Sequence, residues 1–79
     1  MEERINGLLN QFLDVLPAPV GKHIQELITS GEYGVGLEEL CSYLNEYDLP
    51  VSEEEYKTIE EAGLTMGIDI SYWTILKRG

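Results

Sequence analysis

Apolar residues recur at three- and four-residue steps along most of this chain, and prolines and glycines interrupt the pattern. Such spacing gathers apolar side chains on one face of an α-helix. The pattern predicts a first helix from about Glu2 to Leu16, which Pro17 ends because proline disfavours helical geometry at the preceding residue. Its apolar face consists of Ile5, Leu8, Leu9, Phe12, Leu13 and Leu16.

Two more helices are expected in the middle of the chain. Pro19 fits the first turn of the second helix, where a missing N–H is not needed, and Gly31 suits a left-handed helix end. The third helix begins near Tyr33 or as late as Leu37, since two glycines between them each weaken a first turn by about 1 kcal/mol. The apolar positions are Val20, Ile24, Leu27 and Ile28 in the second helix, and Tyr33, Leu37, Leu40, Cys41 and Leu44 in the third.

The clearest local signal begins a fourth helix, predicted from Glu53 to about Met66 with Gly67 as its exit. Ser52 and Glu55 have the spacing of a capping box, in which each side chain accepts a hydrogen bond from the other's backbone N–H. The apolar face of this helix consists of Tyr56, Ile59, Ala62, Gly63 and Met66.

The segment from Ile68 to Gly79 fits a short helix, capped by Asp69 or Ser71, or an alternating strand. A lone strand has nothing to pair with in a helical chain, so we favour a helix that lays Trp73 across the bundle. We therefore predict one all-α domain over residues 1–79. It is a small compact bundle of four helices plus a short C-terminal helical segment.

Residues that could carry catalysis are scarce. One cysteine and one histidine allow neither an internal disulfide nor an ordinary zinc site. We interpret Cys41 as a small buried hydrophobe and His23 as a residue at the edge of an apolar face. We expect no cofactor, no metal and no enzymatic activity. The start Met-Glu-Glu-Arg lacks the features of a secretion signal and no stretch suits a membrane span, so we expect a cytoplasmic protein.

The charge is strongly one-sided, with 15 acidic against 5 basic residues and a net charge of −10. Nucleic acids and anionic membranes are themselves polyanions, so direct binding to either is disfavoured. Between Lys22 and Lys57 there is no lysine or arginine. That stretch contains Glu26, Glu32, Glu38, Glu39, Glu46, Asp48, Glu53, Glu54 and Glu55.

Two interpretations of this acidic stretch remain open. It can be an ordinary solvated surface, or it can be a docking site for a basic protein. Tyr43 and Tyr47, four residues apart within it, favour docking because tyrosine is enriched at binding hot spots. Opposite charge on the partner would also accelerate their encounter.

The same region carries a family resemblance. The motifs are L-C-x-x-L-x-E-Y-D, which ends at Asp48, and S-x-x-E-Y, which begins at Ser52. The likeness extends over roughly residues 27–73. It also includes Tyr33-Gly34 before the two motifs, Pro50 between them, and Ile59, Gly63 and Met66-Gly67 after them. In these positions the chain resembles the MafI-type immunity proteins of bacteria, small acidic cytoplasmic proteins encoded beside polymorphic or contact-dependent toxins.

The resemblance implies an antitoxin that neutralises a cognate toxin domain, expected to be a basic nuclease, by tight protein–protein binding. The expected toxin-binding residues are Glu38, Glu39, Tyr43, Glu46, Tyr47, Asp48, Glu53 and Glu54. If affinity is indifferent to salt, Tyr72, Trp73 and Ile75 become the expected anchor instead. The alternative function is an acidic adaptor or regulatory domain for another cellular protein, which an isolated gene without a neighbouring toxin would favour.

Overall fold

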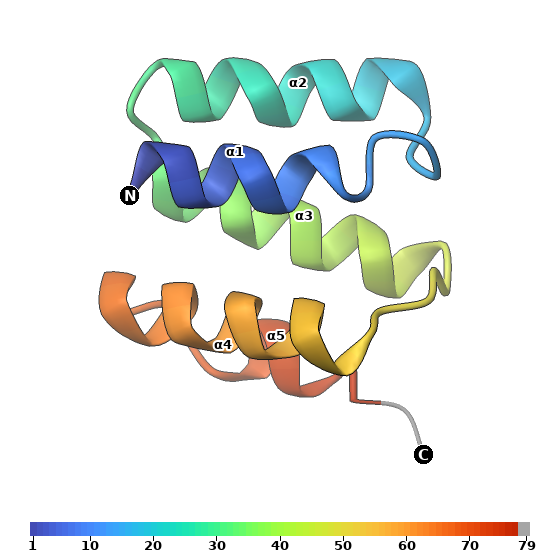
Figure 1. Cartoon of the computed structure of the whole chain (residues 1–79), viewed down its shortest axis with the longest axis vertical. Coiled ribbons are helices and arrows are strands. Elements are labelled where there is room, and N and C mark those ends of the chain that lie inside the picture. The colour runs from blue at the N-terminus through green and yellow to red at the C-terminus, as the bar shows by residue number, and fades with distance from the viewer. Residues whose placement is uncertain (78–79) are drawn as a thin grey trace.

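A computed structural model describes residues 1–77, and within them the chain forms five helices and no strand. The helices α1 (Glu2–Asn10), α2 (Ala18–Thr29), α3 (Tyr33–Glu46) and α4 (Glu53–Met66) run in alternating directions, and α5 (Ser71–Thr74) follows as a short turn (Figure 1). The predicted all-α bundle with a short C-terminal helical segment is thus confirmed. Positions 78–79 of that predicted segment lie outside the described residues.

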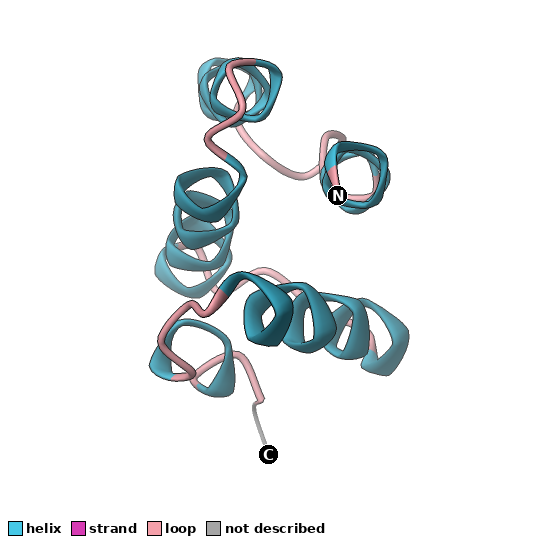
Figure 2. Ribbon diagram, turned by 90° about the vertical axis from the view of Figure 1, so that its left-hand side faces the viewer, coloured by secondary structure: helices cyan, strands magenta, loops and turns pink. Residues whose placement is uncertain are grey.

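The helix α3 is the centre of the bundle, because it packs against each of the other four helices. On one side of it lie α1 and α2, and on the other lie α4 and α5 (Figure 2). The helix α5 contacts only α3 and α4 among the described helices. The molecule measures 34 × 27 × 18 Å, so every helix has one face in the core and one in solvent.

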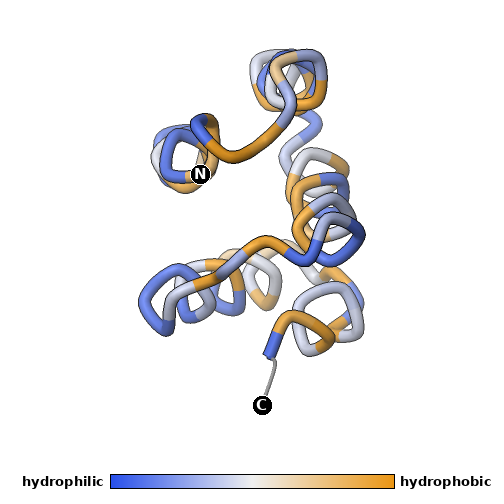
Figure 3. Tube along the Cα trace, turned by 90° about the vertical axis from the view of Figure 1, so that its right-hand side faces the viewer, coloured by the Kyte–Doolittle hydropathy of each residue, from blue (hydrophilic) through white to orange (hydrophobic). Residues whose placement is uncertain are grey.

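One hydrophobic core joins all the helices, and it contains no polar or charged side chain among the described residues. The hydrophobic positions of α2, α3 and α4 lie toward the middle of the molecule (Figure 3). The buried residues are Ile5, Leu8, Leu9, Phe12, Leu16, Ile24, Ile28, Leu37, Leu40, Cys41, Leu44, Ile59, Ala62, Trp73 and Leu76. Most of the predicted apolar faces are therefore the faces that pack.

The first helix is shorter than predicted, since α1 ends at Asn10 and not at Leu16. After Asn10 the chain tightens into turns, with Phe12 N–H donating to Leu9 at 2.9 Å. These tighter turns keep Phe12 in the core but leave Leu13 at the surface. Leu13 instead packs over Gly21 of α2, and a Cβ added to Gly21 would lie 3.0 Å from the Cδ2 atom of Leu13. The prediction was wrong because helical spacing alone cannot show which neighbour an apolar side chain contacts.

The start of α3 settles an alternative that the sequence left open, because the helix begins at Tyr33 in spite of its two early glycines. Gly36 is buried beside Ile28 of α2, and a Cβ there would lie 3.1 Å from Ile28 Cγ1. The Tyr33 hydroxyl donates a hydrogen bond to Glu2 Oε1 at 3.2 Å and so links α3 to α1. Close helix packing compensates here for the low helix propensity of glycine.

The helix ends predicted from glycine are confirmed. Gly31 and Gly67 both have left-handed backbones, with φ of 86° and 70°. After α2, Glu32 N–H donates to Leu27 O at 2.8 Å; after α4, Ile68 N–H donates to Gly63 O at 2.9 Å. These are Schellman motifs, which satisfy carbonyl groups that a helix end would otherwise leave without partners.

The C-terminal segment is held by a close contact between α4 and α5. Trp73 is 1% exposed, and its six-membered ring lies directly on Gly63. A Cβ on Gly63 would lie 2.7 Å from Trp73 Cε3, too close for any side chain to fit without movement. Before α5, Ser71 N–H donates to Asp69 Oδ1 at 2.8 Å, and this hydrogen bond lowers the pKa of Asp69.

Candidate functional site

The C-terminal end of α3 has an aspartate where α2 and α4 have glycine. Asp48 has a φ of 53° and is the one non-glycine residue with a positive φ in the described part of the chain. Leu49 N–H donates to Leu44 O at 3.0 Å, and Asp48 N–H donates to Asn45 O at 3.2 Å, which completes a third Schellman motif.

Two local features of this position favour glycine over aspartate. A left-handed backbone costs most residues with a Cβ about 1–2 kcal/mol relative to glycine, and it costs less for aspartate and asparagine, whose short polar side chains can hydrogen-bond locally. A carboxylate beside the C-terminus of α3 also faces the negative end of the helix dipole, and no basic residue lies in the last turn. Asp48 thus places a carboxylate at a helix end where α2 and α4 have glycine.

Next to Asp48, two tyrosines form a parallel aromatic pair. The rings of Tyr43 and Tyr47 are stacked, with centroids 5.9 Å apart and planes inclined by 7°. Tyr43 packs against the core, whereas Tyr47 is 49% exposed. The inner tyrosine therefore fixes the orientation of the outer one and leaves it accessible to a partner.

The N-terminus of α4 completes this surface. Ser52 Oγ accepts a hydrogen bond from Glu55 N–H at 3.1 Å, and Glu55 Oε1 accepts one from Ser52 N–H at 2.9 Å, so the predicted capping box is confirmed. Glu53 and Glu54 take no part in the capping box, and both are exposed. We define the acidic turn as the residues that surround this α3–α4 connection, namely Tyr43, Glu46, Tyr47, Asp48, Glu53 and Glu54.

The other two predicted toxin-binding residues lie on α3, about one helical turn before Tyr43 of the acidic turn. Glu38 and Glu39 are on the middle of α3 and are only half-exposed. Glu39 Oε1 lies 3.8 Å from His23 Nε2 of α2, so it points toward that helix. Glu38 is close enough to Cys41 for its charge to influence the thiol. Six of the eight residues therefore flank the α3–α4 connection, and the other two lie farther toward the middle of α3.

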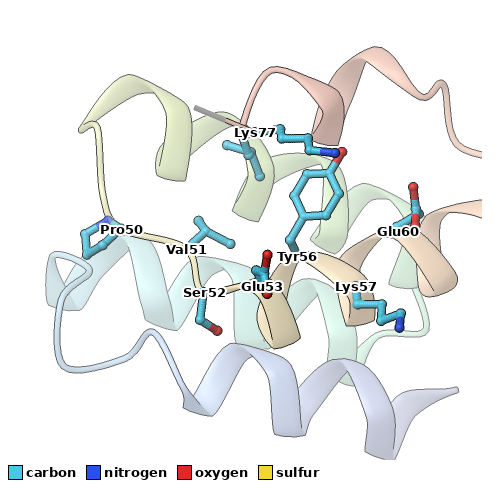
Figure 4. A pocket seen from close by; sticks show the side chains of 9 residues that line it. Pro50, Val51, Ser52, Glu53, Tyr56, Lys57, Glu60 and Lys77 are labelled. Carbon is cyan, nitrogen blue, oxygen red and sulfur yellow. The ribbon is translucent and has the colours of Figure 1, made fainter. Parts of the chain in front are cut away.

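A groove adjoins the acidic turn and shares Glu53 with it. It has a volume of about 1090 Å³ and lies between the start of α4 and the C-terminal segment (Figure 4). The lining residues are Pro50, Val51, Ser52, Glu53, Tyr56, Lys57, Glu60, Leu76 and Lys77. Sequence reasoning missed this groove, because no local pattern places Leu76 and Lys77 opposite α4.

Two residues considered for chemistry have other roles. Cys41 is completely buried, and burial together with the nearby charge of Glu38 raises the pKa of its thiol to about 12. It is therefore protonated at neutral pH and not a nucleophile. His23 is exposed beside Glu39. The described residues contain no group of three or more histidine, cysteine or acidic side chains placed to hold a metal ion.

Trp73 is part of the core and is not available as a surface anchor, unlike its neighbour Ile75, which is 50% exposed. Among the described residues no helix is long and apolar enough to cross a membrane. Comparisons with protein-family models, with curated proteins and with solved structures give no match.

Proposed function

We propose that this chain is an immunity protein that neutralises a basic toxin domain by binding it through the acidic turn. The kind of toxin that best fits this surface is a nuclease. The observation that carries the proposal is the half-exposed ring of Tyr47, which stacks on Tyr43 and lies next to the exposed acidic residues Glu46 and Asp48.

The composition of the acidic turn supports a protein partner. Tyr47 offers a rigid aromatic surface next to the carboxylates of Glu46 and Asp48. Tyrosine contributes contact area together with a polar tip, and carboxylates accept bidentate hydrogen bonds from arginine. A surface of this kind suits the cationic groove with which a nuclease holds the phosphates of its substrate.

The resemblance to MafI-type immunity proteins supports the same surface. Its two motifs meet at the acidic turn: the first ends at Glu46-Tyr47-Asp48, and the second is the capping-box segment that begins at Ser52. The capping box and the Schellman motif hold the two sides of the connection in fixed positions. A preorganised turn loses little conformational entropy on binding, which favours tight association.

In this mechanism the acidic turn occupies the toxin surface that binds nucleic acid. The net charge of −10 accelerates the encounter with a cationic partner, while Tyr47 and its neighbours slow dissociation. The toxin is inhibited because its substrate, also a polyanion, can no longer enter.

Co-expression in a bacterial host with the toxin domain encoded by the neighbouring gene tests this function. We expect the wild-type chain to restore growth and to form a complex with the purified toxin domain. Affinity is expected to fall at least about tenfold between low salt and about 0.5 M salt, because exposed charges are screened. A toxin that kills equally with and without the chain would refute the proposal.

A double variant, Glu46→Lys with Asp48→Asn, tests the acidic turn itself. Asparagine tolerates the left-handed backbone, so this variant changes the charge by three units without adding strain at position 48. Glu26→Lys with Glu61→Gln is the matched control, since both residues are exposed on outer helix faces and the charge change is the same. We expect about 100-fold weaker binding for the first variant and less than threefold for the control.

A further inference from the structure

The groove beside the acidic turn has charged walls and an apolar floor. Glu53, Lys57 and Glu60 follow one another along α4 at helical spacing, and Lys77 stands opposite them on the C-terminal segment. Tyr56 extends across the groove, and the Lys77 side chain reaches toward its hydroxyl end (Figure 4). Leu76, which is buried, and Val51 supply the apolar contact below.

The charges of the groove sum to zero on a chain whose net charge is −10. Lys57 and Lys77 are two of the four basic residues in the described part of the chain. Neither joins an ion pair there, since the one ion pair among the described residues links His23 and Glu39. Glu53 and Lys57 have the spacing and order that favour pairing on a helix, yet they remain separate.

The groove and the acidic turn are too close to be covered separately. Glu53 belongs to both, and a standard protein–protein interface covers about 800 Å² on each partner. A toxin that covers the acidic turn therefore also covers Lys57 or Lys77, or both. A uniformly basic toxin surface would place its own cations against Lys57 and Lys77 as well as against Glu53 and Glu60, and the contacts with the two amines are unfavourable.

We infer that the toxin presents a carboxylate to the groove, so that Lys57 and Lys77 pair with it while the acidic turn holds the surrounding basic surface. This inference rests on the proposed function and specifies the partner more closely. A basic surface with an embedded carboxylate is the chemistry of a nuclease active site, where acidic groups hold metal ions or transfer protons. The chain would then cover the catalytic centre itself.

The inference is tested by whether a negative charge placed in the groove weakens or strengthens binding to the toxin domain. Lys57→Glu and Lys77→Glu are each compared with Lys22→Glu, which makes the same change on an exposed position of α2. If the groove takes a carboxylate, each groove variant binds the toxin domain about tenfold more weakly, while Lys22→Glu binds as tightly as the wild type or more tightly. Lys57→Gln and Lys77→Gln, which add no negative charge to α4 or the C-terminal segment, are expected to weaken binding about threefold.

Equal or tighter binding by the groove variants would overturn the inference, because it would mean that the groove faces a cation or solvent. This result is distinct from failure of the proposed function, in which the wild-type chain itself binds no toxin domain and both proposals fall. If a lysine substitution at one acidic residue of the toxin restores binding to the Lys57→Glu variant, that acidic residue carries the carboxylate that pairs with Lys57. Fluorescence of Trp73, the single tryptophan, verifies that each variant is folded.

Discussion

The two ends of α4 differ in how their residues contribute to the fold. Near its C-terminus, Gly63 and the Trp73 ring are in such close contact that no side chain fits between them. At its N-terminus, the acidic turn leaves Tyr47 half-exposed and holds Asp48 in a backbone conformation that favours glycine. The first region is closely packed, whereas the second exposes an aromatic ring and several carboxylates to solvent. The proposed function assigns binding to the second region, and the following changes test how far folding and binding can be separated.

The largest loss of stability is expected from Gly63→Ala, because the added methyl group overlaps the Trp73 ring. Overpacking of this severity costs about 3 kcal/mol, out of a total of about 4–12 kcal/mol for a chain of 79 residues. Gly7→Ala is the matched control, since Gly7 also lies in a helix but a Cβ added there would meet no atom within 4 Å. It is expected to raise stability by up to about 1 kcal/mol. Urea unfolding followed by circular dichroism measures both.

Ser52→Ala is expected to cost about 1 kcal/mol, because it removes the cap at Glu55 N–H. The same variant sharpens the comparison, since loss of the cap loosens one side of the acidic turn and is expected to weaken toxin binding as well. Ser42→Ala, an exposed change within α3, is the control. An unchanged unfolding midpoint for Ser52→Ala would show that the capping box contributes nothing to the fold.

Asp48→Gly is expected to raise the free energy of unfolding by about 0.5–1 kcal/mol, because relief of the left-handed backbone exceeds the added entropy of the unfolded chain. Gly31→Ala is the reverse change, since it adds a Cβ at a left-handed position, and it is expected to lower the free energy of unfolding by about the same amount. The gain at position 48 is expected to come with weaker toxin binding. A variant that gains stability and keeps full affinity would break the comparison between the two regions.

The smallest effect on the unfolding free energy at neutral pH is expected from the ionisation of the Cys41 thiol. Its folded pKa of about 12 lies above the ordinary value of 9.0, so burial favours the protonated thiol. The resulting stability is complete below about pH 9 and is lost as the pH rises toward 12. We expect a steeper alkaline fall in the unfolding free energy for the wild type than for Cys41→Ala. A thiol reagent at pH 8 is expected to label Cys41 only after unfolding.

Local sequence signals predicted the features of the fold that depend on few residues. Ser52 and Glu55 specified the start of α4, and Gly31 and Gly67 specified two helix ends. Features that depend on distant neighbours were beyond those signals. Leu13 leaves the predicted first helix to cover Gly21. The position of Trp73 across the bundle was predicted, but its contact with Gly63, which makes room for the ring, was not.

The candidate site was predicted in its chemistry but not in its extent. The charge and tyrosine pattern indicated the residues around Tyr47 and Asp48, which the structure brings together. The same pattern included Glu39, which turns toward His23 because it lies on the α2 side of α3. The pattern could not reveal the groove at Lys77, since its walls come from segments far apart in the chain.

Amide hydrogen exchange of the chain, free and bound to the toxin domain that the proposed function requires, tests the central claim most directly. The account predicts that slowed exchange on binding is concentrated at residues 46–54, with further protection near Lys57 and Lys77, while the outer face of α2 is unchanged. A complex in which residues 46–54 exchange as fast as in the free chain, with protection confined to α1 and α2, would contradict it.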